Sequence, residues 1–292
     1  MSTRPAAQHR DVLTRITLSN LQHMHATGEK IAILTCYDAS FAALLESCDI
    51  DALLIGDSLG MVIQGHDSTL PVSMDDMCYH TTAVARGCRR PFLIADMPFG
   101  STGVSPQHCY ENAVRLIQAG ATMVKIEGGQ HMADTTEHLS LREVLVCAHI
   151  GLMPQSVHQL GGYKIQGLNE VEEARLLADA LAQQEAGAAM LLIEAVPASL
   201  AAKITQSLHI PTIGIGAGAN LSGQVLVLYD MLNISQGKKA RFVKNYIHSA
   251  TDISQAVRNY VAEVKAGSYP AEEHTYSSSP SRQHAGSIRS KG

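Results

Sequence analysis

The sequence predicts a single closed (βα)8 barrel of the TIM type, and three observations support this fold class. Short apolar runs of strand length recur eight times along the chain, and segments of helical character separate most of them. The chain has 292 residues, close to the size of one such barrel. An open, doubly wound parallel sheet is the alternative fold, but eight strand–helix units favour closure into a barrel.

Each of the eight apolar runs ends in a polar or glycine-containing segment. Their nearly continuous apolar character is typical of strands in a parallel sheet, which are buried on both faces. The runs occupy residues 31–38, 52–58, 91–98, 123–129, 146–152, 190–197, 212–218 and 225–230. We therefore expect each run to contribute one strand.

Two of the intervening segments carry clear helix boundaries. Ser105 is followed by a proline, which combines an N-cap residue with a proline at the first helical position, and Gly120 follows the end. Asn169 and Glu172 have the spacing of a capping box at the start of a second helix, which Gly187 closes. Both segments are predicted to be helices.

The remaining segments set the limits of the domain. Residues 153–168 and 218–224 are expected to be loops, and residues 1–20 to lie outside the barrel or to cover one of its ends. Residues 277–292 are rich in serine, polar and without periodicity, which predicts a disordered tail. The prediction is one barrel domain over residues 1–276, with an N-terminal extension.

Composition excludes several classes of protein. The net charge of −5 and an aromatic content of 4% argue against nucleic-acid binding, which usually requires a basic surface and stacking side chains. The chain shows neither a signal peptide nor an apolar stretch long enough to span a membrane. Its six cysteines show no C-x-x-C pairing and are expected to be buried apolar residues in a reducing compartment. We therefore predict a cytoplasmic protein that binds neither nucleic acid nor membrane.

Polar residues gather where the predicted strands end, which in a TIM barrel is the end that carries the active site. A single aspartate after a strand is usually a turn residue or a helix cap. Several acids at the same end of one barrel repel one another unless a cation lies among them. The polar residues at the strand ends are Tyr37, Asp38, Asp57, Ser58, Asp96, Lys125, Glu127, His149, Glu194 and Asp230.

Strand periodicity orients some of these side chains. Lys125 and Glu127 are two residues apart and therefore point to the same face of their strand, into the barrel. The same period places Ile55 with Asp57, and Ile94 with Asp96, on the inner face. An internal Lys–Glu ion pair that only stabilises the barrel mouth is the alternative interpretation.

Oxygen ligands without cysteine or paired histidine indicate a hard cation such as Mg²⁺. Asp57 and Asp96 are predicted to be direct ligands, and Glu127 to bind directly or through water. Glu194 lies on the sixth strand, across the barrel, where it is free to act on a substrate as a base. His149 either orients a substrate oxygen or is a structural histidine.

The segment GIGAGAN (214–220) is glycine-rich but is not a dinucleotide-binding fingerprint. Its spacing is G-x-G-x-G, and it follows the seventh strand rather than opening a first βαβ unit. We expect it to allow close approach of the backbone to a ligand, or a tight turn.

Seven segments together resemble the ketopantoate hydroxymethyltransferase family over roughly residues 14–276. They are LIGDSLGMVIQGHDSTLPVSMDDMCYHTTAVARG, LIADMPFG, MVKIEGG, HIGLMPQSV, GGYKIQG, LLIEAVP and GIGAGAN. The resemblance implies a (βα)8 barrel of the phosphoenolpyruvate/pyruvate superfamily that assembles as a decamer of two pentamers and uses Mg²⁺. It also implies transfer of a hydroxymethyl group from 5,10-methylenetetrahydrofolate to 3-methyl-2-oxobutanoate (α-ketoisovalerate), giving ketopantoate for pantothenate synthesis.

The resemblance also assigns roles to matching positions. Asp57, Asp96 and Glu127 match the metal ligands, whereas Asp57, Ser58, Asp96 and Lys125 match the contacts to the keto acid. Glu194 matches the proton acceptor. Two other functions remain open at this point: another Mg²⁺-dependent lyase or mutase of the same superfamily, and a non-catalytic barrel that serves as a scaffold.

Overall fold

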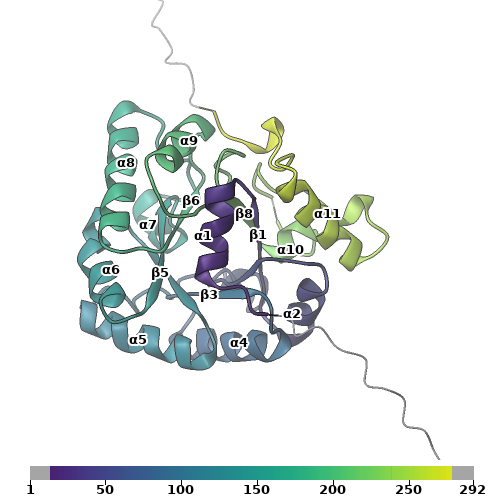
Figure 1. Ribbon diagram of the computed structural model, residues 1–292, viewed down its shortest axis with the longest axis horizontal. Coiled ribbons are helices and arrows are strands. Elements are labelled where there is room, and N and C mark those ends of the chain that lie inside the picture. The colour runs from purple at the N-terminus through teal and green to yellow at the C-terminus, as the bar shows by residue number, and fades with distance from the viewer. Residues whose placement is uncertain (1–13, 238, 278–292) are drawn as a thin grey trace, which may run out of the picture.

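Eight parallel strands form a closed barrel in the order β1 to β8 (Figure 1). The computed structural model describes residues 14–237 and 239–277. The strands are β1 (Ile31–Thr35), β2 (Ala52–Ile55), β3 (Phe92–Asp96), β4 (Met123–Glu127), β5 (Leu145–Gly151), β6 (Met190–Glu194), β7 (Thr212–Ile215) and β8 (Gly223–Leu226). β8 pairs with β1, so the predicted closed barrel is confirmed and the open sheet is wrong.

Helices surround the barrel and cover the apolar outer faces of the strands (Figure 1). They are α1 (Leu18–Thr27), α2 (Ala39–Glu46), α3 (Leu59–Val62), α4 (Met74–Gly87), α5 (Pro106–Ala119), α6 (Ala133–Ser140), α7 (Val157–Leu160), α8 (Glu170–Glu185), α9 (Ala198–Gln206), α10 (Leu228–Met231) and α11 (Ile253–Lys265). Short 3₁₀ turns lie at Gln130–Met132, Pro154–Ser156, Ile247–Ser249 and Glu272–His274. None of the helices in the described ranges is long and apolar enough to cross a membrane.

The helix boundaries follow the cap residues. Ser105 accepts a hydrogen bond from the backbone N–H of His108 at the start of α5, and Gly120 ends that helix at a φ of 116°. Asn169 accepts from Glu172 N–H at the start of α8, at 3.0 Å. The Glu172 carboxylate accepts from the side-chain amide of Asn169 at 2.7 Å and from the backbone N–H groups of the two residues before Asn169, but not from the Asn169 backbone N–H that a capping box requires.

Four local predictions are wrong. Residues 223 and 224, expected in a loop, belong to β8, and the last part of the predicted run 225–230 forms α10 instead of strand. A short 3₁₀ turn and α7 lie within 153–168, expected to be a loop. Leu54, and not Ile55, lines the barrel interior. The strand ends at Ile55, so the two-residue alternation does not continue from Ile55 to Asp57.

α1 covers the end of the barrel where the strands begin (Figure 1). Of residues 1–20, expected to lie outside the barrel or to cover one end, residues 14–20 are described and include the start of α1, whereas residues 1–13 lie outside the described residues. Leu21 of α1 is fully buried, and the ring of His25 lies 2.8 Å from the hydroxyl of Ser222, the residue before β8. With one end closed by α1, the opposite end is left for ligands. The predicted tail lies, except for its first residue, outside the described residues.

The barrel strands are almost wholly buried, and the cysteines belong to this apolar interior. All six cysteines are free thiols, and all but the half-buried Cys78 are buried, as expected for small apolar residues. Burial raises the pKa of Cys36 to about 12, which keeps its thiol neutral and unreactive.

Gly223 is predicted to be essential for barrel closure, because a Cβ there would lie 2.3 Å from the carbonyl oxygen of Ile31 on the neighbouring strand. We expect Gly223→Ala to lower the free energy of unfolding by about 1–3 kcal/mol, the usual cost of overpacking. Gly103→Ala is the matched control, since no atom lies within 4 Å of its Cβ position. Urea denaturation of both variants checks this; equal stabilities would contradict the closure argument.

Candidate active site

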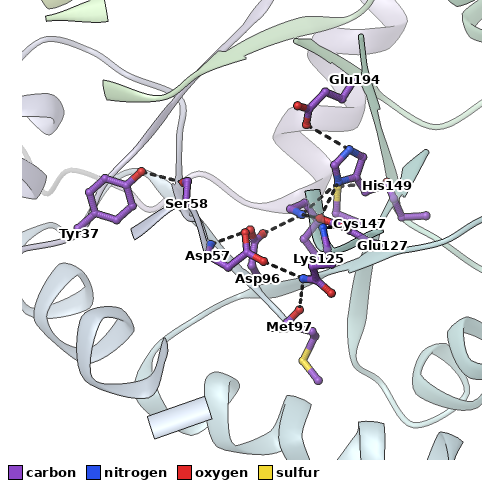
Figure 2. A network of polar contacts seen from close by, with 12 residues as sticks. Tyr37, Asp57, Ser58, Asp96, Met97, Lys125, Glu127, Cys147, His149 and Glu194 are labelled. Carbon is purple, nitrogen blue, oxygen red and sulfur yellow. Dashed lines mark hydrogen bonds and ion pairs between the residues drawn. The ribbon is translucent and has the colours of Figure 1, made fainter. Parts of the chain in front are cut away.

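A cavity of about 830 Å³ opens at the carboxyl ends of the strands, where a TIM barrel carries its active site. Its lining includes every predicted site residue: Asp57, Ser58, Asp96, Lys125, Glu127, His149 and Glu194. Figure 2 shows these side chains as one polar network, with Tyr37 and Ser58 on one side and His149 and Glu194 on the other. The structure therefore brings together residues that span more than a hundred positions in the sequence.

The backbone of Asp57 is hydrogen-bonded to the side chain of Asp96. The Asp57 N–H donates to Asp96 Oδ2 at 3.0 Å, which fixes the turn after β2 against the end of β3. Gln155 reaches across from the segment after β5, and its side-chain amide donates to Asp57 Oδ2 at 2.8 Å. Its backbone N–H donates to Glu127 Oε2 at 3.0 Å. One residue thus links two of the three predicted metal ligands.

Lys125 is the buried cation of the site. Its side chain is 4% exposed, and Nζ lies 3.2 Å from Asp96 Oδ1 and 3.9 Å from Glu127 Oε1. Burial alone would lower the pKa of Lys125, but the neighbouring carboxylates of Asp96, Glu127 and Asp57 outweigh burial and raise this pKa. Lys125 therefore stays charged at neutral pH.

His149 joins Lys125 to Glu194. Its Nδ1 lies 3.2 Å from Lys125 Nζ, and its Nε2 lies 3.4 Å from Glu194 Oε2. Burial and the charge of Lys125 hold the pKa of His149 well below its usual range, so the ring is neutral. An ammonium group can only donate, which makes Nδ1 the acceptor and places the ring proton on Nε2, facing Glu194.

The carboxylates of the site are hard to ionise. Burial raises the pKa of Glu127 to about 8, although Lys125 opposes the shift. Burial likewise raises the pKa of Glu194 to about 8, again against the effect of Lys125. Burial, together with the charges of Asp96 and Glu127, raises the pKa of Asp57 well above its ordinary value. One lysine does not neutralise this group of acids.

The predicted ligands fit a cation by their chemistry. Asp96 Oδ1 and Glu127 Oε1 are buried and accept no hydrogen bond of good geometry. Lys125 Nζ lies 3.2 Å from the first and 3.9 Å from the second, so the two oxygens share one ammonium group, and a second cation would offset the cost of burying them. Asp57, Asp96 and Glu127 supply only oxygen atoms, as Mg²⁺ prefers. In the described part of the chain, no three His, Cys, Asp or Glu side chains already converge on one point as a finished metal site. Lys125 and Gln155 occupy the space between these carboxylates.

Two other strand-end acids have different positions from those expected. Asp38 caps α2, where its carboxylate accepts from Phe41 N–H at 2.9 Å, so it is a structural residue. Asp230 does not end a strand; it lies in α10, although it still lines the cavity.

Sequence analysis missed Gln155. Its only sequence signal was its position shortly after the fifth strand, in a segment interpreted as a loop. A neutral amide carries no charge pattern, and its two acidic partners come from other strands. Its role therefore becomes visible only when the barrel is closed.

The glycine-rich segment after β7 brings a side chain of the protein itself close to its backbone, and the predicted approach of a ligand stays untested. Gly216 has a φ of 62°, and a Cβ there would lie 2.5 Å from the ring of Phe242. The segment therefore accepts an aromatic ring against its backbone at the wall of the cavity.

Comparison with known proteins assigns the family. Residues 15–272 match the family model described as ketopantoate hydroxymethyltransferase. The chain belongs to the ketopantoate hydroxymethyltransferase family. This membership favours ketopantoate formation over the two other functions that the sequence had left open, namely a different lyase or mutase and a non-catalytic scaffold.

Curated members of this family are similar over nearly their whole length. The 3-methyl-2-oxobutanoate hydroxymethyltransferase of Nitrosomonas europaea is 61% identical over 262 residues, which cover 90% of this chain and 97% of that protein. The enzyme of the same name from Nitrosospira multiformis is 60% identical, covering 90% of this chain and all of that protein (100%). The counterpart in Neisseria gonorrhoeae is 56% identical, with 89% and 99% covered.

Solved structures support the fold alone. A phosphonomutase-like protein from Burkholderia cenocepacia has a TM-score of 0.59 at 17% identity, covering 74% of this chain and 94% of that chain. A 2,3-dimethylmalate lyase, described as a member of the PEP mutase/isocitrate lyase superfamily, has a TM-score of 0.54 at 16% identity, covering 74% and 82%. Both share the barrel architecture of this chain, and the superfamily expected from the sequence stays a prediction.

Glu194→Gln is predicted to stabilise the metal-free protein at alkaline pH. The folded-state pKa of about 8 exceeds the ordinary value of 4.5, so the folded state favours the protonated form. The stability that the folded protein gains from holding this proton is fully present below about pH 4.5, and it is lost as the pH rises through about 8. The glutamine is neutral throughout, so its melting temperature should exceed that of the wild type by about 3 °C or more at pH 8.5.

The two proteins should have the same melting temperature near pH 4, where Glu194 is protonated in both the folded and the unfolded state. Glu273→Gln is the control, because its side chain is 80% exposed. Calorimetric scans at both pH values measure the difference. A lower melting temperature for Glu194→Gln at pH 8.5 would show that the carboxylate is not destabilised by burial.

Proposed function

We propose that this chain transfers a hydroxymethyl group to 3-methyl-2-oxobutanoate, with Glu194 as the base and Lys125 as the group that stabilises the developing charge. One observation carries this proposal: a buried carboxylate of raised pKa and a buried ammonium group line the same cavity and are joined by His149. A base and a cation in this arrangement suit removal of a proton next to a ketone.

Lys125 and the turn after β2 bind the keto acid. The Lys125 ammonium has three donors and a fixed position among acids, so it can donate to the C2 oxygen as negative charge develops there. Ser58, with its hydroxyl 2.9 Å from that of Tyr37, offers a further hydrogen bond to the keto acid. Asp57 and Asp96 complete this contact surface, consistent with the roles that the family resemblance implies.

Glu194 removes the proton from C3. Since a general base works best when its pKa lies near the operating pH, a value of about 8 suits this role far better than an ordinary glutamate would. His149 orients the base through its Nε2, and it does not compete for the proton because its own pKa is low. The C3 carbon then bonds to the methylene carbon of the folate as one C–N bond of the methylene bridge breaks. Water supplies the hydroxyl oxygen as the second C–N bond breaks, and tetrahydrofolate leaves with the protons that its nitrogens need.

Asp57, Asp96 and Glu127 would hold Mg²⁺. When bound, the ion would act as a Lewis acid that polarises the ketone oxygen. The buried oxygens of Asp96 and Glu127, which share the Lys125 ammonium group as their charge partner, support this assignment. The one-carbon donor proposed for this chain is 5,10-methylenetetrahydrofolate.

The proposed setting of the enzyme is the cytoplasm, as a decamer of two pentamers acting in pantothenate synthesis. The family resemblance supports this assembly. Exposed apolar side chains such as Val104, Leu141 and Val171, each at least 74% exposed, offer surface for subunit contacts.

Removal of divalent ions is predicted to abolish turnover. In chelator-treated protein, the carboxylates of Asp57, Asp96 and Glu127 lack their charge partner and the keto acid loses its electrophilic activation. We expect ketopantoate formation to stop in EDTA and to return when Mg²⁺ is added in excess. Full activity in exhaustively chelated protein would contradict the assignment of these acids as metal ligands.

Exchange of the C3 hydrogen with D₂O separates the roles of the acids, because it requires the base but no folate. We expect Glu194→Gln to slow exchange by about 10²–10⁴-fold, the usual contribution of a positioned general base. Mg²⁺-dependent binding of the keto acid should survive in this variant. Asp57→Asn and Asp96→Asn should instead weaken binding and exchange together, since each removes charge from the cation site.

NMR follows the exchange, and calorimetry follows keto-acid binding. Glu273→Gln, in the exposed C-terminal segment, is the control and should match the wild type in both measurements. Wild-type exchange in Glu194→Gln would place the base elsewhere, and His149 would become the next candidate.

A further inference from the structure

The cavity is larger than the keto acid requires. Pockets of about 300–1,000 Å³ usually hold drug-sized ligands, and the 830 Å³ here far exceeds the size of a five-carbon keto acid. The residues already assigned line the part of the cavity between β2 and β6. The part next to β7, β8 and the C-terminal segment has a different lining. We call it the aromatic compartment, and it is formed by Ile215, Val227, Tyr229, Ile234, Phe242 and Tyr276.

The rings of the aromatic compartment are held in fixed positions. Phe242 packs against the backbone of Gly216 and meets Tyr276 edge to face, with 6.5 Å between ring centroids. The carbonyl of Tyr276 accepts a hydrogen bond of 2.9 Å from Ala198 N–H, which ties the C-terminal segment to the start of α9. Tyr229 meets Tyr37 edge to face at 5.7 Å. The compartment is therefore a preformed apolar surface.

Asp230 places one carboxylate at this compartment. Its side chain is 27% exposed, and Oδ1 accepts a hydrogen bond from the Ser235 hydroxyl and lies 3.7 Å from Lys239 Nζ. Both contacts go to Oδ1, so within residues 14–237 and 239–277 Oδ2 has no partner. The other cavity acid without an assigned role, Asp67, is exposed on the loop before α4.

Asp230 lies close to the keto-acid end of the cavity. Tyr229, the neighbour of Asp230 in the chain, meets the ring of Tyr37 edge to face with 5.7 Å between ring centroids. The Tyr37 hydroxyl also lies 2.9 Å from Ser58. A ligand in the aromatic compartment would therefore adjoin the bound keto acid.

We propose that the aromatic compartment binds the pterin ring of the folate, with Asp230 accepting hydrogen bonds from the 2-amino group and N3–H of that ring. The proposal rests on the proposed function, which requires a folate beside the keto acid. A reduced pterin has apolar faces that suit aromatic and aliphatic walls. Its edge presents two parallel N–H donors, the arrangement that a carboxylate accepts from a guanidinium group.

The alternative role for Asp230 is structural, since it also holds the segment after α10 through Ser235. Two variants distinguish the roles. Asp230→Asn keeps the size of the side chain but replaces an acceptor oxygen by a donor, which opposes the donors of the pterin. Ser235→Ala removes the structural hydrogen bond and keeps the carboxylate.

The test measures binding of tetrahydrofolate to the full chain by calorimetry, beside C3 exchange without folate. Hydrogen bonds to a charged group contribute about 1.5–3 kcal/mol, so Asp230→Asn should raise the Kd for tetrahydrofolate by about 10–150-fold. Exchange should stay within about twofold of the wild type, because the keto-acid end is untouched. Ser235→Ala and the matched control Asp67→Asn should bind tetrahydrofolate as the wild type does.

Three results would overturn the proposal: wild-type tetrahydrofolate binding in Asp230→Asn, equal loss in Ser235→Ala, or loss in Asp67→Asn instead. Loss of exchange together with tetrahydrofolate binding in Asp230→Asn would also overturn it, by showing that Asp230 acts through the structure of the whole site. Failure of the proposed function looks different, since the wild type itself would then show no C3 exchange.

Discussion

The buried ammonium group of Lys125 is the interaction on which the rest of the site depends. Transfer of several carboxylates from water into the barrel is costly, and attraction to Lys125 offsets part of that cost. Lys125 Nζ lies within 4 Å of both Asp96 and Glu127 and contacts His149. Without it, these acids would be buried close together with no compensating charge. The imbalance that remains is the physical basis for assigning a second cation to this end of the barrel.

The register of the sheet brings these groups together. Asp96 pairs with Lys125 across β3 and β4, and Glu127 pairs with His149 across β4 and β5. Gly151 pairs with Glu194 across β5 and β6, and a Cβ on that glycine would collide with the Glu194 carbonyl oxygen at 2.2 Å. The ion pairs thus follow from backbone pairing that the barrel requires in any case. The backbone pairing that closes the barrel therefore also sets the relative positions of these side chains.

The same barrel supports different chemistries because the loops and outer segments vary. Solved structures at 16–17% identity share the architecture, and they show the fold alone. In this chain, the cavity continues beyond the polar cluster to a wall made by β7, β8 and the C-terminal segment. A cavity with a polar half and an apolar half suits the proposed reaction, in which a polar keto acid and an aromatic folate must bind next to each other. The neutral ring of His149 and the fixed rings of Phe242 and Tyr276 are prearranged, so little has to reorganise when ligands bind.

The sequence by itself determined the barrel, most strand positions, the caps of α5 and α8, and the inward pair Lys125 and Glu127. These features depend on local periodicity and cap chemistry, which neighbouring residues specify. Only the tertiary structure decided that Gln155 links two acids, that Asp230 lies in a helix, and that Leu54 rather than Ile55 faces inward. Each of these depends on where a strand stops or on which distant segment packs against it. Contacts of this kind form only when the barrel closes, so a local sequence pattern cannot predict them.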